Sequence, residues 1–297
     1  MPDPSPDLSA GPSPDPSVRP SDAPVDDPIS RHQLVAELVG TDSLWTRIDV
    51  VEETGSTNAD LAAAARDGAE EGTVLVADHQ SAGRGRLGRT WSAPPGTSVA
   101  MSVLLRPDVP LEEWTWLPLL AGLAVSDGIR QETDLPADLK WPNDVLLLGR
   151  KVCGVLAERV ETPTGPAVVI GMGINVHLTT EQLPVPTATS LALTLADLGV
   201  PHVPVSRTSL VSTTLRSLER ILGHWRDVAG VRGRGTEALA LAYRERCTTI
   251  GREVRISLSD GTSVDGVAHD VDASGRLVLT VGDSTRTFGA GDVVHLR

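Results

Sequence analysis

The sequence predicts an α+β domain of helices and strands that is followed by a small C-terminal β-barrel. Between residues 31 and 247, runs with helical periodicity alternate with β-rich runs. From about Thr248 onward, short strands follow one another with turn residues between them, which is typical of a small barrel. A chain of 297 residues has room for about two such domains.

The first 30 residues differ in composition from the rest. Pro, Ser and Asp dominate them and aromatic residues are absent. Such a segment buries too little apolar surface to offset the entropy lost on ordering, so residues 1–30 are predicted to be a disordered tail. The segment lacks the basic start and apolar run of a signal peptide. No later run has the roughly 18 apolar residues of a membrane helix.

The folded elements follow from periodicity and from turn residues. Strands are predicted over 48–53, 73–78, 97–105, 139–141, 145–148, 152–160 and 167–176. Helices are predicted over 31–39, 57–69, 117–133, 188–198, 206–228 and 235–246. At the second of these helices, Thr57 is expected to be the N-cap, with Asp60 completing a capping box.

Four short strands are predicted after residue 248, over 253–258, 262–271, 277–281 and 286–288. Asp260-Gly261 is the expected hairpin turn between the first two. The domain division is therefore a tail (1–30), a larger domain (31–247) and a C-terminal β-barrel domain (248–297).

Charge and cysteine content exclude several classes of function. The formal net charge is −13, which argues against nonspecific binding to nucleic acid or to an anionic membrane. Cys153 and Cys247 are too few for a disulfide framework or a metal cluster, so a reducing cytoplasm is expected. The seven histidines show no metal-ligand spacing.

Lysine is rare in this chain. Of 26 basic residues, 24 are arginine, and Lys140 and Lys151 are the two lysines. Codon bias explains why lysines are few, but not where these two lie. A lysine ammonium is a compact charge that can approach one reacting oxygen, whereas the guanidinium of arginine is a broad fork. At least one of the two lysines is therefore expected to be functional.

The loop 80–91 combines glycines and arginines. Gly83, Gly85 and Gly88 match the dinucleotide-binding pattern GxGxxG, but the following Ser92–Gly96 segment cannot begin the helix that a Rossmann loop requires. The arginines that alternate with these glycines are Arg84, Arg86 and Arg89. Glycines let backbone N–H groups approach an anion, and arginines donate charge-assisted hydrogen bonds to it. The loop is interpreted as an anion clamp, the alternative being a solvated basic turn.

Two further segments carry charged groups. In Lys140-Trp-Pro-Asn-Asp144, the Asp144 carboxylate could hold Mg²⁺ on a triphosphate or form an ion pair with Lys140. Lys151 lies at the tight turn that enters the strand predicted over 152–160, and a rigid element there would place its charge precisely. Cys153 on the same strand is expected to be a buried apolar residue. The glycines of Gly171-Met-Gly-Ile-Asn175 indicate close approach of a ligand or of backbone.

Taken together, these segments resemble the biotin protein ligases over about residues 45–297. The resemblance rests on five segments in the family's order: Ser56-Thr57-Asn58, Gly83–Arg89 with Trp91, Lys140–Asp144, Gly149-Arg-Lys151 and Gly171–Asn175. It implies a mixed-sheet catalytic domain with flanking helices, of the class II synthetase-like or biotin–lipoate ligase fold, and an SH3-like C-terminal barrel.

The resemblance also implies a reaction. Biotin and MgATP form biotinyl-5′-AMP, and the biotinyl group then passes to a lysine of a biotin carboxyl carrier domain of an acyl-CoA carboxylase. Lys151 and Arg84 would be catalytic. The implied biotin-binding residues are Ser56, Thr57, Asn58, Gln80, Gly83, Arg84, Arg86, Lys151 and Gly154. The implied nucleotide-binding residues are Arg86, Arg89, Trp91, Asn143, Asp144 and Asn175, with Asp144 also serving Mg²⁺.

Other functions are compatible with parts of the sequence. A lipoate–protein ligase would share the fold, and a non-catalytic biotin-binding sensor or a plain structural domain would need neither Lys151 nor Arg84. Some members of the family carry a helix-turn-helix module of about sixty residues before the ligase. Here only residues 31–45 are available for it, so no DNA-binding role is expected. The sequence decides neither the oligomeric state nor the carboxylase that is modified.

Overall fold

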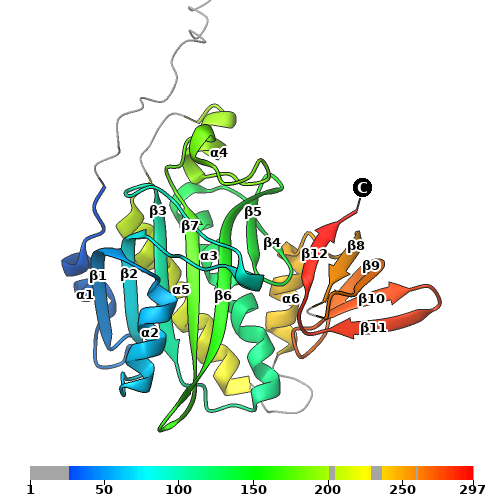
Figure 1. Cartoon of the computed structure of the whole chain (residues 1–297), viewed down its shortest axis with the longest axis horizontal. Helices are drawn as coiled ribbons and strands as arrows, with labels where there is room; N and C mark the ends of the chain where they lie inside the picture. The colour runs from blue at the N-terminus through cyan, green and yellow to red at the C-terminus, as the bar shows by residue number, and fades with distance from the viewer. Residues whose placement is uncertain (1–26, 201–204, 229–235, 259, 297) are drawn as a thin grey trace, which may run out of the picture.

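The computed structural model describes residues 27–200, 205–228, 236–258 and 260–296; most of the predicted tail, residues 1–26, lies outside this part. Seven strands form the larger sheet in the order β1-β2-β3-β7-β6-β5-β4 (Figure 1). Their bounds are β1 Arg47–Thr54, β2 Thr73–Gln80, β3 Ser98–Leu105, β4 Ala137–Lys140, β5 Asp144–Leu147, β6 Arg150–Thr162 and β7 Gly165–Asn175. Because β1 and β2 pair in parallel while the other neighbours pair antiparallel, the sheet is mixed, as expected.

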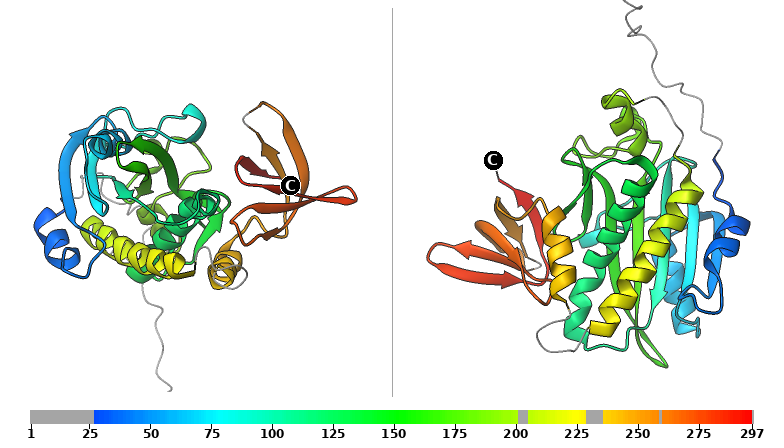
Figure 2. Two further views of the ribbon diagram at one scale, coloured as in Figure 1. Left: turned by 90° about the horizontal axis from the view of Figure 1, so that it is seen from below. Right: turned by 180° about the vertical axis from the view of Figure 1, so that it is seen from behind.

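Helices cover both faces of this sheet. The α-helices are α1 Arg31–Leu38, α2 Thr57–Arg66, α3 Leu117–Thr133, α4 Leu191–Asp197, α5 Arg207–Val228 and α6 Glu237–Arg246. Short 3-10 turns are η1 Arg86–Gly88, η2 Leu111–Trp116 and η3 Thr180–Gln182. The long helices α3 and α5 lie side by side on one face, and α2 lies on the other (Figures 1 and 2).

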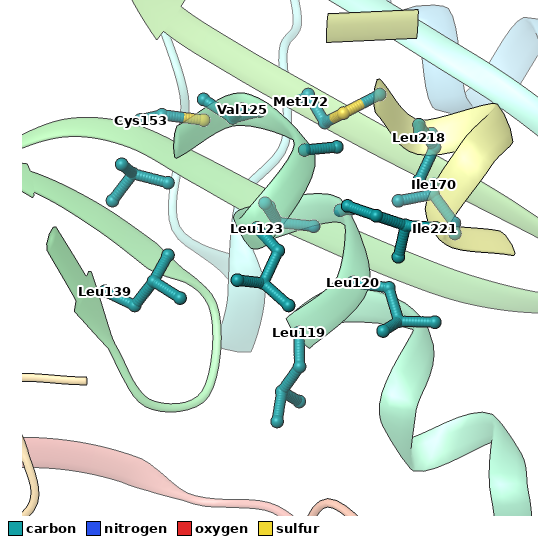
Figure 3. Close-up of a cluster of buried hydrophobic side chains, with 14 of the residues drawn as sticks. Leu119, Leu120, Leu123, Val125, Leu139, Cys153, Ile170, Met172, Leu218 and Ile221 are labelled. Atoms are coloured by element: carbon teal, nitrogen blue, oxygen red, sulfur yellow. The ribbon is translucent and has the colours of Figure 1, made fainter. Parts of the chain in front are cut away.

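The main core fills the space between the sheet and these two long helices. Leucines of α3 contact β7 and α5 there, as the close-up of Leu120, Ile170 and Leu218 shows (Figure 3). β3 is central in the sheet, and all eight of its residues are buried. A strand covered on both faces loses the apolar–polar alternation of a surface strand, which explains the apolar run in its sequence.

The C-terminal part forms a separate five-stranded antiparallel sheet in the order β11-β10-β9-β8-β12. Its strands are β8 Glu253–Ser257, β9 Ser263–Val271, β10 Leu277–Val281, β11 Ser284–Phe288 and β12 Asp292–His295. The sequence did not predict β12, whose four residues are too short to show a clear alternation. Indole N–H groups of the larger domain tie the two sheets together: Trp116 donates to the Ala273 carbonyl at 2.8 Å, and Trp141 donates to the Gly275 carbonyl at 3.1 Å.

Two local predictions were wrong. Ser56, and not Thr57, caps α2: its hydroxyl accepts a hydrogen bond from the Ala59 N–H at 3.5 Å. Asp60 does not complete a capping box, because its carboxylate accepts a hydrogen bond from Thr54 instead. Thr57 is thus the first helical residue, which leaves its side chain free to turn into the protein.

The end of the predicted tail is also packed. The Ser30 hydroxyl caps α1, and its backbone N–H donates to the Thr208 hydroxyl at 2.9 Å. The Asp27 carboxylate accepts a hydrogen bond of 2.6 Å from the Arg207 backbone N–H. Residues 27–30 therefore belong to the folded part, because α5 supplies hydrogen-bond partners that the local sequence does not reveal.

Candidate active site

A pocket lies between the loop 80–91, the start of α2 and the strands β6 and β7. Ten predicted site residues from four separate segments line it: Ser56, Thr57, Asn58, Gln80, Arg84, Arg86, Trp91, Asn143, Lys151 and Gly154. The fold therefore brings together most of the residues that the sequence singled out.

Polar side chains from the start of α2 line one part of the pocket. Ser56, Thr57 and Asn58 are all buried, and so is Gln80 at the end of β2. The backbone N–H of Thr57 donates to Oε1 of Gln80 at 2.8 Å. Because this donor fixes the amide oxygen, Nε2 of Gln80 is free to donate elsewhere.

The pocket also has a cationic part. Nζ of Lys151 lies 2.5 Å from Oδ1 of Asp144, and the side chain of Lys151 is 41% exposed. Lys151 therefore keeps an accessible charge while Asp144 holds it in place. The alternative ion pair between Asp144 and Lys140 is not formed, and Lys140 does not line the pocket.

The three loop arginines point to different partners. Arg84 forms an ion pair of 3.8 Å with Glu158, and Arg86 donates to Oδ1 of Asn143 at 2.8 Å. Burial lowers the pKa of Arg86 from its ordinary value. Arg89 forms an ion pair with Asp292 of the C-terminal sheet. The loop thus has a defined conformation in which each arginine has a partner within the protein.

Glycines allow Trp91 to lie against the sheet. A Cβ added to Gly173 would lie 2.6 Å from the indole Nε1 of Trp91. Likewise, a Cβ on Gly83 would lie 2.9 Å from Nε2 of Gln80. Close approach of a ligand or of backbone was expected at Gly173, and the group that approaches it is instead the indole side chain of Trp91.

Four predicted residues do not line this pocket. Gly83 and Arg89 line an adjoining cavity on the same loop. Asp144 contributes through its ion pair with Lys151. Asn175 lies at the end of β7, where Nδ2 donates to the Thr189 carbonyl at 2.9 Å. The structure therefore gives Asn175 a hydrogen bond within the fold.

Sequence analysis missed several pocket residues. Five of them are Ala100, Met101, Val155, Leu156 and Met172. Those on β3 and β6 belong to apolar runs. In such a run, the sequence does not distinguish a residue of the core from a residue that lines a pocket. Glu158, which forms an ion pair with Arg84, was missed as well.

Metal-binding clusters, membrane-spanning helices and the reactivity of Cys153 can be assessed among the described residues. Within them, no group of three or more His, Cys, Asp or Glu side chains is placed to hold a metal ion, and no helix is long and apolar enough to cross a membrane. Burial raises the pKa of Cys153 to about 12, so its thiol stays protonated, as expected for a buried apolar residue.

Family models and known proteins match most of this chain. Residues 50–175 match the biotin/lipoate A/B protein ligase family, and residues 249–296 match the biotin protein ligase C-terminal domain. The chain is 45% identical to the biotin–[acetyl-CoA-carboxylase] ligase of Mycobacterium tuberculosis, over 91% of this chain and 97% of that protein. It is 33% identical to the bifunctional ligase/repressor BirA of Bacillus subtilis, over 89% of this chain and 77% of that protein.

Solved structures show the same fold. The biotin protein ligase of Aquifex aeolicus in complex with biotin and ATP superposes with a TM-score of 0.68 at 25% identity, over 85% of this chain and all of that one. The fold and the matched segments together define a ligase of the biotin/lipoate class. Within that class, the chain belongs to the biotin protein ligase family: it is an ATP-dependent enzyme that attaches biotin to protein.

Proposed function

We propose that the pocket beside Lys151 is where this ligase forms biotinyl-5′-AMP and transfers the biotinyl group. The observation that carries the proposal is the convergence of a neutral hydrogen-bonding part, at Ser56, Thr57 and Gln80, with a cationic part at Lys151 and Arg86. Biotin has the same polarity, with a neutral ureido ring at one end and a carboxylate at the other.

The first step requires charge stabilisation. A carboxylate oxygen of biotin attacks the α-phosphorus of ATP, an acyl–phosphate bond forms and pyrophosphate leaves. Both reacting groups are anionic, so cations aimed at the phosphoryl oxygens lower the barrier, and one well-placed donor contributes about 3 kcal/mol. Lys151 and Arg84 are proposed to supply this charge. The ion pair with Asp144 keeps the Lys151 ammonium aimed into the pocket.

Nucleotide binding is proposed for the residues around the loop. Six residues are assigned to the adenylate: Arg86, Arg89, Trp91, Asn143, Asp144 and Asn175. Three of these, Arg86, Trp91 and Asn143, line the pocket. In the structure, Asn175 lies outside the pocket, where its Nδ2 donates to the Thr189 carbonyl.

Mg²⁺ is proposed to enter with ATP. The ion commonly keeps several waters and takes one or two protein carboxylates together with substrate phosphates. Asp144 alone satisfies that requirement, which fits the lack of a larger acidic cluster among the described residues. Bound there, Mg²⁺ would supply charge neutralisation on the phosphates.

The second step delivers biotin to an acceptor. The lysine amine of the acceptor attacks the acyl carbon, an amide bond forms, AMP leaves and one proton is released. We propose a biotin carboxyl carrier domain of an acyl-CoA carboxylase as the acceptor and the cytoplasm as the location. The name of the Mycobacterium tuberculosis relative supports the acceptor, and the two free, buried cysteines are compatible with a reducing compartment.

The direct test is transfer of labelled biotin to a purified carrier domain with MgATP. Wild-type enzyme should label the carrier, and Lys151→Arg should lose 100-fold or more in rate, about 2.7 kcal/mol or more. Lys140→Arg is the matched control, because it changes the other lysine, which lies outside the pocket, and should retain activity.

Other outcomes identify the alternatives. Full activity of Lys151→Arg would show that the reaction needs only a positive charge at this position. The rarity of lysine in the chain would then say nothing about function. Binding of biotin without transfer would indicate a sensor. Labelling with lipoate in preference to biotin would indicate a lipoate ligase.

A further inference from the structure

Strand β6 contains a β-bulge directly after Lys151. Val145 of β5 pairs with Cys153 of β6. The next residue of β5, Leu146, pairs with Lys151 and not with Val152. Val152 is therefore an extra residue without a partner on β5. A bulge of this kind re-aims nearby side chains, and bulges are frequent next to active sites.

The bulge turns Lys151 onto the face of the sheet that lines the pocket. In a regular strand, successive side chains point to opposite faces. Val152 and Cys153 are consecutive, yet both are buried in the main core, where Figure 3 shows Cys153. Counted back from Cys153 along a regular strand, Lys151 would share this apolar face. The extra residue places it on the opposite face, where it lines the pocket.

Hydrogen bonds hold the backbone of Lys151 in this position. Its N–H donates to the Thr187 carbonyl at 2.8 Å, and its carbonyl accepts from the Thr189 N–H at 2.8 Å. Both partners belong to the segment before α4, which at this point takes the place of β7 as the neighbour of β6. The direction in which the side chain leaves the strand is therefore fixed, and its flexible stem keeps the remaining freedom.

The bulge also makes Lys151 and Gly154 neighbours on one face, although residues three apart in a regular strand face opposite ways. A Cβ added to Gly154 would lie 3.0 Å from Nζ and 3.1 Å from Cε of Lys151. Apart from the chain neighbours of Gly154, no other described residue comes within 4 Å of that point. Gly154 does not have a positive φ, so the reason for a glycine here is space and not backbone conformation.

The folded-back lysine side chain ends at Asp144. This residue pairs with Gly154 across β5 and β6, so it lies on the same face. Nζ of Lys151 is 2.5 Å from Oδ1 of Asp144, and this buried oxygen accepts no hydrogen bond from another described residue. Displacing the ammonium would therefore leave a buried oxygen without a partner, which is unfavourable.

We propose that Gly154 is a positioning residue for Lys151. The missing side chain leaves the space in which the ammonium folds back to Asp144, and a methyl group at position 154 would push the ammonium away from that carboxylate. Gly154 acts in this way through Lys151 and not through a contact with substrate. The inference rests on the role of Lys151 proposed above, but the position of the ammonium can be measured without any substrate.

The scarcity of lysine makes this measurement direct. In protein labelled with isotopic lysine, the Lys140→Arg variant gives a single Cε signal by NMR, from Lys151. Asp144→Asn should shift this signal in the ligand-free protein, because it removes the carboxylate beside the ammonium. With Gly154→Ala already present, Asp144→Asn should leave the signal unmoved, since the pair is already broken.

Gly173→Ala is the matched control. Gly173 pairs directly with Gly154 and lies on the same face, but a Cβ added there meets Trp91 and not Lys151. This variant should keep the full shift on Asp144→Asn. A second readout is the rate of pyrophosphate release at saturating biotin and MgATP, which Gly154→Ala should lower by about tenfold or more, because the cation is misplaced.

Three results would overturn the inference. A full shift in Gly154→Ala would show that the methyl group leaves the ion pair intact. No shift in the protein that keeps Gly154 would show that the pair is not formed. Failure of Gly154→Ala to fold would show that the methyl group meets more than the flexible end of Lys151. A lost shift with an unchanged rate would instead support the positioning and contradict the proposed function of Lys151.

Discussion

The guanidinium of Arg86 donates to Oδ1 of Asn143 at 2.8 Å, which joins the glycine-rich loop to the turn after β4. The same guanidinium donates to the Gly291 carbonyl of the C-terminal sheet at 3.1 Å. One side chain thus holds three segments around the pocket. Because the loop covers the place proposed for the adenylate, these bonds should control how long that reactive intermediate stays bound.

Arg86→Gly should therefore still form biotinyl-5′-AMP but release it early. The substitution removes both hydrogen bonds and leaves Lys151 in place. Rapid filtration followed by chromatography measures free biotinyl-5′-AMP. Arg276→Gly, which removes an exposed arginine paired with Asp272, is the control and should release none. Wild-type retention in Arg86→Gly would contradict the proposed closure.

Gly173→Ala should disturb Trp91. The added carbon would lie 2.6 Å from the indole, so the ring must move out of the pocket wall. We expect biotin affinity to fall at least tenfold, about 1.4 kcal/mol, together with a change in tryptophan fluorescence. In Gly223→Ala the new methyl group meets nothing within 4 Å, so binding should be unchanged.

Arg207→Met should destabilise the larger domain. The side chain of Arg207 is 2% exposed, and it forms ion pairs with Asp27 and Asp78. Breaking a buried pair leaves charges without a partner, so the free energy of unfolding should fall by about 3 kcal/mol. Arg216→Met removes an arginine that is 57% exposed and should cost less than about 1 kcal/mol in the same urea titration.

His295 should make stability depend on pH. Burial, followed by the charges of Lys140 and Arg252, lowers the pKa of His295 from 6.5 to about 4. The Thr249 hydroxyl accepts from the backbone N–H of Trp141 and lies 3.2 Å from Nε2 of His295.

The sign of the effect follows from this lowered pKa. As the pH falls through 6.5 the unfolded chain takes up a proton, whereas the native protein does so only near pH 4. The stabilisation is complete above pH 6.5 and is lost toward pH 4. Wild type should lose stability relative to His295→Gln across this window in thermal unfolding. A constant difference between the two proteins would show that His295 does not titrate there.

Much of the fold follows from local sequence signals. The helix predicted over 117–133 coincides with α3, and every strand of the larger sheet was predicted within a few residues. Periodicity succeeds here because each element buries one face or both, and that burial fixes the spacing of apolar residues. The errors occur where a contact with a residue distant in sequence determines the local structure. Examples are the cap of α2 and Asp27, whose partner is Arg207.

The sequence by itself determined which side chains carry chemistry: the lysine at 151, the arginine–glycine loop and the polar start of α2. Only the tertiary structure decided how they are paired. Asp144 holds Lys151 and not Lys140, and Asn175 lies outside the pocket. Thr57 donates to Gln80 and Asn58 donates to Glu158, and both of these partners lie far from the start of α2 in sequence. Hydrogen bonds and ion pairs act over a few ångströms in space, so strand register and loop conformation select the partners.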